Sequence, residues 1–385
     1  MLSRRVRSCG PLRVLFVVPR LGLGGAERHA ATLITHLDRE RFAPSLVCIG
    51  IPGALGEELA AAGVPVRALH RSRGRLPLAL LDLVRHLHRV RPDVVVLRGR
   101  NAEALGRLAA VLAGVPRAVV WVHNNHDLGR RTRLRRLADR VLEPATSAYY
   151  GVAESQLRYI TGGLGYPAEK VRIIHNGVDV GRFRVAERDP ALAAELGIGP
   201  DEPVAGTVAV LRPEKDLATF LRAARLVLDR EPRARFLVVG RGPLAGELRA
   251  LADELGLAGR VVFTGARSDV PALLSLLDVF VLSSYTEAFP MAVLEAMAAG
   301  RPAVCTAVGG VAEAVDDGVT GYLVPPRDPA ALAGRIADLL ADPGRARSMG
   351  AAARARVEAE FTLERSVRRA AEALERTAGR AVAGV

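Results

Sequence analysis

Short apolar runs alternate with amphipathic helical segments along this chain, and the pattern restarts once near residue 204. Runs such as 12–18 and 93–97 are apolar at most positions, which is typical of strands buried on both faces of a parallel sheet. In the first half we expect strands at 12–18, 45–50, 64–69, 93–97, 118–123 and 171–174. The helices between them are expected at 25–38, 54–62, 77–90, 101–114, 130–142 and 154–162.

This alternation predicts the α/β class, with parallel sheets covered by helices on both faces. The irregular stretch 178–203 and the restart at 204–210 predict two such domains, and 385 residues exceed one ordinary domain. We therefore expect a first Rossmann-like domain at 1–182 and a second at 183–361. Residues 362–385 are expected to hold one last amphipathic helix.

Composition argues against a membrane span and against a disulfide scaffold. The longest apolar stretches are interrupted by Arg117 and Asp278, and neither reaches the roughly 18 apolar residues that a span requires. The apolar run 14–18 behind the basic opening is too short for a secretion signal. Three widely spaced cysteines predict neither a disulfide framework nor a zinc site. We expect a cytoplasmic protein.

The net charge of +13 is concentrated in the first half of the chain. Residues 1–190 carry a net charge of +15, whereas residues 191–385 carry −2. The run 130–140 holds six arginines around Leu134, Leu137 and Val141, which share one helical face. Such a helix is often simply solvated; the sharper hypothesis is contact with anionic lipid or an acidic acceptor. Because only 4% of residues are aromatic, we expect no nucleic-acid partner.

Two glutamates eight positions apart, Glu287 and Glu295, carry most of the functional information. The apolar run 279–284 predicts a buried strand, and Pro290 and Gly300 suit the start and the end of the helix that follows. A strand–loop–helix of this kind points backbone N–H groups at one spot, where phosphate can bind. Glu295 leans back toward the same spot. Because burying a carboxylate without partners is costly, a lone acid in this nearly apolar helix indicates a functional role. The combination suits a nucleotide sugar.

These residues resemble the E-x7-E signature of retaining glycosyltransferases, specifically glycosyltransferase family 4. The resemblance extends along most of the chain, in the family's order. It rests on the segments 22–28 (with Gly-Gly-Ala-Glu), 171–179 (with Asn-Gly-Val-Asp), 206–215, 236–243, 261–265 and 309–321.

The resemblance implies a GT-B fold, in which two Rossmann-like domains face each other and the last helix crosses back to the first. The second domain would bind the donor, and the first the acceptor. Glu295 would accept hydrogen bonds from the ribose hydroxyls. The diphosphate would be held by the amides of Phe289, Pro290 and Met291 together with Lys215 and Arg212.

Two further features refine this donor site. The family often places an arginine five residues before the lysine, and Val210 stands there, so Arg212 is the substitute candidate. Gly24 and Gly25 either form a tight turn into a helix or let the backbone approach the donor phosphates, and the resemblance favours the second. A third glycine at the dinucleotide position is missing, which argues against a nicotinamide site. Since no Asp-x-Asp occurs, we expect no obligatory metal.

His123 ends an apolar run at 118–122, where the carboxyl end of a parallel strand favours ligand binding. The resemblance implies that a histidine here contacts the transferred sugar, and a neutral imidazole can donate without adding fixed charge. Asn124, Asn125 and His126 are alternatives. Glu287 is expected to address the sugar as well. Same-face attack by the acceptor and a covalent intermediate on Glu287 both remain open.

The expected function is therefore retaining transfer of a sugar from a nucleotide-diphosphate sugar, a substrate rather than a cofactor, to an acceptor hydroxyl. Synthesis of polysaccharide, glycolipid or lipid-linked glycan at an anionic membrane surface is the leading hypothesis. A soluble small-molecule acceptor is the alternative. A nucleotide-sugar epimerase on the same fold and a binding module without activity are the rivals.

Overall fold

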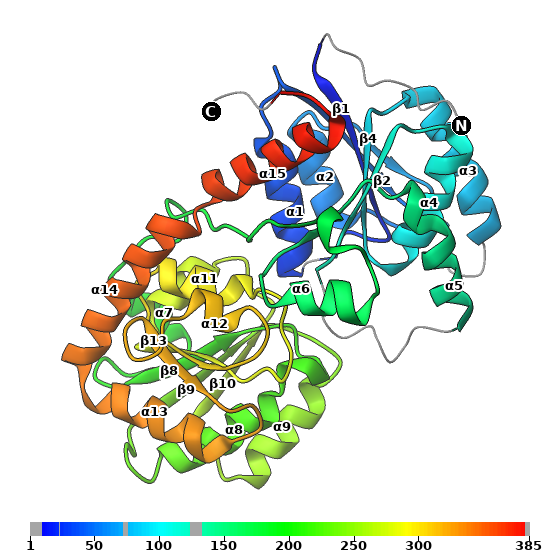
Figure 1. The fold of residues 1–385 in the computed structure, drawn as a ribbon. Helices are drawn as coiled ribbons and strands as arrows, with labels where there is room; N and C mark the ends of the chain where they lie inside the picture. The colour runs from blue at the N-terminus through cyan, green and yellow to red at the C-terminus, as the bar shows by residue number, and fades with distance from the viewer. Residues whose placement is uncertain (1–9, 23, 72–75, 124–132, 382–385) are drawn as a thin grey trace. The chain divides into compact units, whose positions relative to one another are not determined.

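The computed structural model describes residues 10–22, 24–71, 76–123 and 133–381, and the chain divides into two compact units. Unit 1 comprises Met1–Asn176 with Glu364–Val385, and unit 2 comprises Gly177–Leu363. Each unit has a parallel sheet flanked by helices on both faces (Figure 1). The α/β class and two Rossmann-like units are therefore confirmed. No described helix combines the length and apolar character needed to cross a membrane.

In the described part of unit 1 the sheet has seven strands in the order β3-β2-β1-β4-β5-β6-β7. The strands are β1 (Leu12–Val18), β2 (Phe42–Cys48), β3 (Val66–Ala68), β4 (Val94–Arg98), β5 (Arg117–Trp121), β6 (Ala148–Gly151) and β7 (Val171–Ile173). The helices are α1 (Gly25–His36), α2 (Gly53–Ala61), α3 (Leu76–Val90), α4 (Arg100–Ala113), α5 (Arg133–Leu142) and the short α6 (Gln156–Arg158). Figure 1 shows α1 and α2 on one face of the sheet, and α3, α4 and α5 on the other.

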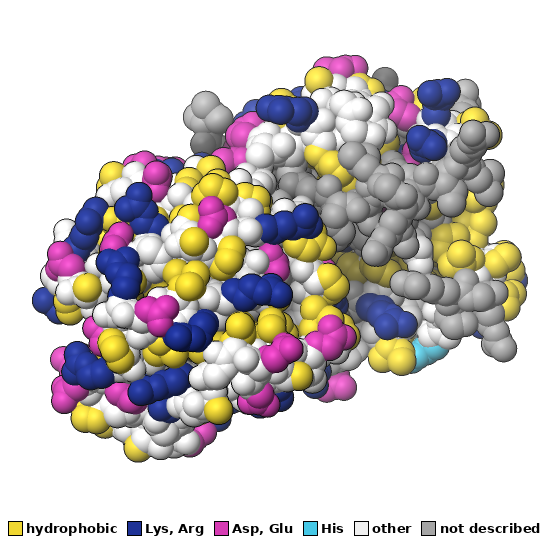
Figure 2. Space-filling view, turned by 90° about the horizontal axis from the view of Figure 1, so that it is seen from below, with side chains coloured by type: hydrophobic (Ala, Val, Ile, Leu, Met, Phe, Trp, Pro, Cys, Tyr) yellow, Lys and Arg dark blue, Asp and Glu magenta, His cyan; other side chains and the backbone are white. Residues whose placement is uncertain are grey.

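Unit 2 has six strands in the order β10-β9-β8-β11-β12-β13. They are β8 (Val204–Val208), β9 (Arg235–Val239), β10 (Val261–Gly265), β11 (Val279–Leu282), β12 (Ala303–Thr306) and β13 (Gly321–Val324). The helices are α7 (Pro190–Glu195), α8 (Leu217–Val227), α9 (Ala245–Glu254), α10 (Val270–Ser275), α11 (Met291–Ala298), α12 (Val311–Ala314), α13 (Pro329–Ala341) and α14 (Pro343–Glu360). On the face drawn in Figure 2, basic and acidic side chains are interspersed over this unit, at the left, in keeping with the near-zero charge of residues 191–385.

Three helices of unit 2 begin at an Asp-Pro pair. Asp189, Asp328 and Asp342 each accept a hydrogen bond from a backbone N–H in the first turn of α7, α13 and α14. Proline at the first helical position has the right φ and lacks an N–H that would otherwise need an acceptor. The local sequence therefore sets where these helices start.

The last helix, α15 (Leu363–Ala378), returns to unit 1, as the fold class predicts. Its Glu375 forms an ion pair with Arg41, with 2.8 Å between Nη2 and Oε2. Its Thr377 lies 2.7 Å from Tyr150, oxygen to oxygen, and the carbonyl of Thr377 accepts from Arg117. These contacts attach α15 to β5, to β6 and to the residue that precedes β2.

The strand prediction for unit 1 missed β6, whose Ala-Tyr-Tyr-Gly sequence is short and follows a 3-10 turn, Glu143–Ala145. The tyrosines are buried, so the strand is defined by packing rather than by a long apolar run. The helix expected at 154–162 is only α6 followed by a π-helical turn, Tyr159–Gly163. Of the helix expected at 130–142, residues 130–132 lie outside the described part.

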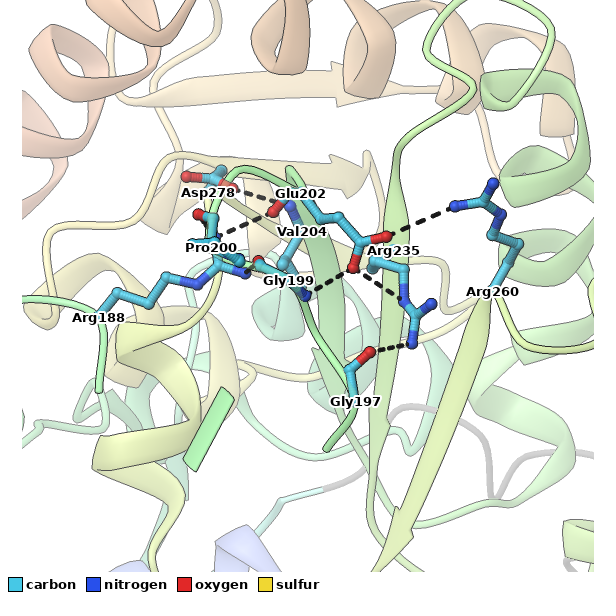
Figure 3. A network of polar contacts seen from close by, with 9 residues as sticks. All are labelled: Arg188, Gly197, Gly199, Pro200, Glu202, Val204, Arg235, Arg260 and Asp278. Carbon is cyan, nitrogen blue, oxygen red and sulfur yellow. Dashed lines mark hydrogen bonds and ion pairs between the residues drawn. The ribbon is translucent and has the colours of Figure 1, made fainter. Parts of the chain in front are cut away.

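At the amino ends of the unit 2 strands, a network of polar contacts connects the segment 177–203, which contains α7, to the sheet (Figure 3). Glu202 accepts from the Gly199 N–H at 2.7 Å and lies 3.7 Å from both Arg235 and Arg260. Arg188 donates to the carbonyls of Gly199 and Glu202. The network lies at the edge opposite to the carboxyl ends, so it supports the sheet and is not part of the site below.

Candidate active site

The carboxyl ends of β8 and β11 mark the point where the strand order of unit 2 reverses. Ligands of open parallel sheets bind at such a point, because the following loops diverge there and leave a crevice. Lys215 follows β8 and Glu287 follows β11, and Nζ of Lys215 lies 2.5 Å from Oε1 of Glu287. Their side chains are 24% and 10% exposed, so the pair is largely buried but still reaches the surface. The fold thus brings two predicted site residues together.

Hydrogen bonds connect the two loops that carry this pair. Ser284 donates to the same carboxylate oxygen of Glu287 at 2.6 Å, and its own carbonyl accepts from Thr306 on β12. Ser283 donates to the Lys215 carbonyl at 3.0 Å, and the Tyr285 N–H donates to the Glu214 carbonyl at 3.1 Å. The carboxylate of Glu287 is therefore held by its neighbours rather than free in solvent.

Helix α11 begins directly after this loop, with Pro290 as its N-cap residue. Because the first N–H groups of a helix have no acceptor within it, the start of α11 offers donors to an anion. Pro290 has no N–H, so the prediction that it supplies an amide is wrong, and only Phe289 and Met291 of that trio can donate. Glu295 lies on the same helix and is partly exposed.

Arg212 is exposed in the loop that follows β8, directly before the turn that holds Lys215. A second loop lies against it, because the Leu211 N–H donates to the carbonyl of Arg241 after β9. Gly242 packs so tightly against the backbone of Leu211 that a Cβ would collide with it. Arg241 is thus a further exposed cation fixed beside Arg212, and it was missed because Gly-x-Gly loops after strands are common.

In unit 1, Gly24 and Gly25 open α1, with Gly24 as the N-cap residue. The carboxylate of Glu27 folds back beside Gly24, where a Cβ would have to displace it. The negative charge of Glu27 also favours the protonated form of Arg98, the last residue of β4. β1 and β4 are neighbours, and the strand order of unit 1 reverses between them. This glycine turn therefore lies at the corresponding point of the first sheet.

His123 follows β5, and its ring stacks on Trp121 with the centroids 5.6 Å apart. Within the described residues, its Nε2 is buried and has no hydrogen-bond partner. Burial lowers the pKa of His123 well below its ordinary value, and the charge of Arg98 and then His29 lower it further. The imidazole is therefore neutral at physiological pH, as its predicted role requires. The alternatives Asn124, Asn125 and His126 lie outside the described residues.

The described residues contain no cluster of three His, Cys, Asp or Glu side chains that could hold a metal ion. Cations and helix N–H groups line the unit 2 site, and such groups can stabilise a departing phosphate. Sequence analysis missed Ser284, which ends the apolar run 279–284, and Arg98 and His29. The available signal for Arg98 was a basic residue directly after the apolar run 93–97.

Two family models match the chain. Residues 189–356 match the model described as "Glycosyl transferases group 1", and residues 23–182 match "Glycosyltransferase Family 4". The two matches cover most of unit 2 and most of unit 1.

Characterised relatives cover most of the chain. A GDP-mannose-dependent α-(1-6)-phosphatidylinositol monomannoside mannosyltransferase of Mycobacterium tuberculosis is 33% identical over 313 residues, 76% of this chain and 78% of the relative. The UDP-Gal:α-D-GlcNAc-diphosphoundecaprenol α-1,3-galactosyltransferase of Escherichia coli is 28% identical, over 78% of this chain and 81% of the relative. A D-inositol 3-phosphate glycosyltransferase of Streptomyces scabiei is 32% identical, over 66% of this chain and 61% of the relative.

Solved structures share the fold. Anabaena HepE in complex with UDP-glucose has a TM-score of 0.84 at 23% identity, covering 95% of this chain and 100% of HepE. The sucrose-phosphate synthase of Thermosynechococcus elongatus has a TM-score of 0.79 at 22% identity, covering 92% of this chain and 96% of that protein.

Proposed function

Because this chain belongs to glycosyltransferase family 4, we propose that it transfers a hexose from a nucleotide-diphosphate sugar to a hydroxyl of a lipid-linked glycan, with retention of configuration. The observation that carries the proposal is the Lys215–Glu287 pair at the strand-order reversal of unit 2, beside the start of α11. There a cation, a carboxylate and the start of a helix lie together beyond the carboxyl ends of the strands, where parallel sheets bind their ligands.

In the proposed donor site, the diphosphate lies at the N-terminus of α11. The N–H groups of Phe289 and Met291 and the charges of Lys215 and Arg212 would bind it. These groups interact most strongly with the leaving diphosphate as its charge develops, so they favour the transition state over the bound substrate. Glu295, on the same helix, would accept from the ribose hydroxyls.

Glu287 and His123 would address the sugar in this proposal. Glu287 is oriented by Lys215 and Ser284, and an oriented carboxylate can stabilise the positive charge of an oxocarbenium-like sugar. The neutral imidazole of His123 can exchange a hydrogen bond with a sugar hydroxyl without repelling that charge. Same-face attack by the acceptor hydroxyl then gives retention without a covalent intermediate.

The acceptor class is supported by two relatives whose names specify a diphosphoundecaprenol and a phosphatidylinositol acceptor. A membrane contact through unit 1 would bring the enzyme to such a lipid. Its net charge is strongly positive, and anionic lipid attracts each nearby arginine by about 1 kcal/mol.

The face of unit 1 that α3, α4 and α5 form fits this contact. α4 packs against both α3 and α5, and each helix exposes a pair of apolar side chains one turn apart. A buried ion pair between Arg107 and Asp139 fixes α5 on α4. On α5, Arg136 and Arg140 are exposed too; Arg130 and Arg131 lie outside the described residues, as do the side chains of Arg133 and Arg135. The apolar pairs are Leu78 and Leu81, Leu108 and Leu112, and Leu137 and Val141.

Vesicle co-sedimentation tests the membrane contact. We expect binding to anionic but not to neutral vesicles, weakening as salt rises because screening shortens the reach of exposed charge. The test variant changes Arg130, Arg131, Arg133, Arg135 and Arg136 to Gln. The control variant removes five exposed arginines of unit 2, Arg222, Arg225, Arg230, Arg233 and Arg347. Equal binding to both vesicle types, or equal loss in both variants, contradicts the proposed surface.

A donor panel tests the activity itself. UDP-, GDP-, ADP- and dTDP-sugars are incubated with lipid-linked acceptors, and nucleotide release and glycosylated product are measured. We expect one donor to give product, and Lys215→Met to lower turnover more than nucleotide affinity. An isomerised sugar formed from donor alone would identify an epimerase. Nucleotide binding without release or isomerisation would identify a binding module.

A soluble acceptor is the second candidate, because the Streptomyces scabiei relative acts on D-inositol 3-phosphate. The same panel separates the two candidates when D-inositol 3-phosphate replaces the lipid-linked acceptor.

A further inference from the structure

A row of three large side chains crosses the sheet of unit 1 beneath His123. In the register of β4, β5 and β6, Arg98 lies opposite Trp121, and Trp121 lies opposite Tyr150. Residues in register on neighbouring strands project to the same face, and so does His123, two positions after Trp121. The guanidinium of Arg98 lies 5.3 Å from the Trp121 ring centroid, and Tyr150 meets that ring edge-on at 5.4 Å.

The row is buried: Arg98 is 6% exposed, Trp121 1% and Tyr150 0%. Burying a guanidinium is costly, so a cation at the end of a strand needs compensation. Two sources are visible: the face of the Trp121 ring, which attracts a cation, and the carboxylate of Glu27. Burial lowers the pKa of Arg98 to about 9 despite Glu27, so the side chain is still charged at neutral pH.

α15 covers this face of the sheet and contacts the cluster at two places. Thr377 is hydrogen bonded to Tyr150, at one end of the row. Ser366 donates its proton to the carbonyl of His175 at 2.8 Å, so its oxygen accepts from Nε2 of buried His29 at 3.3 Å. This assigns the proton of neutral His29 to Nε2 and leaves Nδ1 as an acceptor.

Besides burial, two basic groups among the described residues lower the pKa of His123: Arg98 from β4 and His29 from α1. Burial lowers the pKa of His29 to about 3, and the charge of Arg98 contributes to that shift. Glu27 of α1 faces Arg98, while α15 presents Ser366 and Thr377, which do not titrate near neutrality. The positive charge of Arg98 therefore lowers the pKa of both imidazoles.

We propose that Arg98 is the positioning residue for His123. Its guanidinium packs on the Trp121 ring, the indole packs on the imidazole ring, and its positive charge adds to burial in disfavouring the imidazolium. α15 supports this arrangement through two hydrogen bonds, between Thr377 and Tyr150 and between Ser366 and His29. Arg98 itself does not touch the substrate. The proposal rests on the proposed function, in which His123 contacts the transferred sugar.

The test compares Arg98→Met with Arg98→Lys, which keeps the charge. The resonances of 13C-labelled histidine are titrated, with His123 assigned from the spectrum of His123→Asn. In Arg98→Met we expect the pKa of His123 to rise, because a group that disfavours the imidazolium has been removed. Turnover should then fall at acidic pH, by about tenfold one pH unit below the new pKa, if the neutral ring is required. Arg98→Lys should keep the wild-type pH profile.

Comparing the KM for the donor with kcat distinguishes a loss of His123 positioning from a general loss of structure. Because unit 2 is proposed to hold the nucleotide, we expect KM for the donor to be unchanged in Arg98→Met while kcat falls. Tyr150→Phe, which removes only the bond to Thr377, should lower kcat without changing the pH profile; it also serves where Arg98→Met does not fold.

An unchanged His123 titration in Arg98→Met overturns the proposal, and so does an equal loss of kcat at every pH. If Arg98→Met does not fold, wild-type kcat in Tyr150→Phe overturns it instead. Absence of transfer by the wild-type protein with every donor would refute the proposed function instead, and the histidine titration would still report on Arg98.

Discussion

Replacing Glu287 by Gln should strengthen nucleotide binding while it slows transfer. In the structure Lys215 already forms an ion pair with Glu287, because its Nζ lies 2.5 Å from Oε1 of that carboxylate. A diphosphate that binds beside this pair must share or take over that ammonium group, and it must also approach the carboxylate charge. Both effects of Glu287 oppose binding of the anion.

The magnitude follows from the geometry of the pair. With an effective dielectric constant of about 20, charges roughly 3 Å apart attract by about 5 kcal/mol, and desolvation offsets most of this. A charge-assisted hydrogen bond retains about 1.5–3 kcal/mol. If binding of the diphosphate sacrifices about half of that, Glu287→Gln regains roughly 1 kcal/mol, or about fivefold in Kd. Removing the carboxylate from the transition state should lower kcat by about 100-fold or more.

Isothermal titration calorimetry with UDP and GDP measures the first effect, and turnover with the matching sugar measures the second. Lys215→Met and the double variant complete a cycle that isolates the pair. The gain from Glu287→Gln should shrink when Lys215 is absent. Weaker nucleotide binding in Glu287→Gln would refute the competition for Lys215 and assign Glu287 to the nucleotide itself.

Three further outcomes are expected. Glu295→Ala should weaken nucleotide binding by about 1.5–3 kcal/mol through the lost ribose hydrogen bonds, and calorimetry showing wild-type affinity contradicts the assignment. Transfer should persist in excess EDTA, because cations and the start of α11 supply the positive field; loss that Mg²⁺ or Mn²⁺ restores contradicts this. Glu202→Ala should lower the free energy of unfolding by about 1–2 kcal/mol in urea, because the Gly199 N–H and two arginines lose a partner. Exposed Glu254→Ala, the control, should change it by less than about 0.5 kcal/mol.

Much of the unit 2 site could be predicted from the sequence because its parts are local. The apolar run 279–284, the proline before α11 and the eight-residue spacing of Glu287 and Glu295 are all features of one strand–loop–helix segment. Hydrophobic periodicity and capping residues act over a few positions, so they indicate such a segment without knowledge of its neighbours.

Contacts between distant segments were decided only by the tertiary structure. Lys215 meets Glu287 across 72 positions because β8 and β11 are adjacent, and local periodicity does not encode strand order. The row of Arg98, Trp121 and Tyr150 likewise needs the register of three parallel strands. Ser366 reaches His29 across 337 positions, once α15 has packed on unit 1. The sequence by itself determined the kinds of elements and the chemistry at their ends, whereas burial of the apolar faces decided which ends meet.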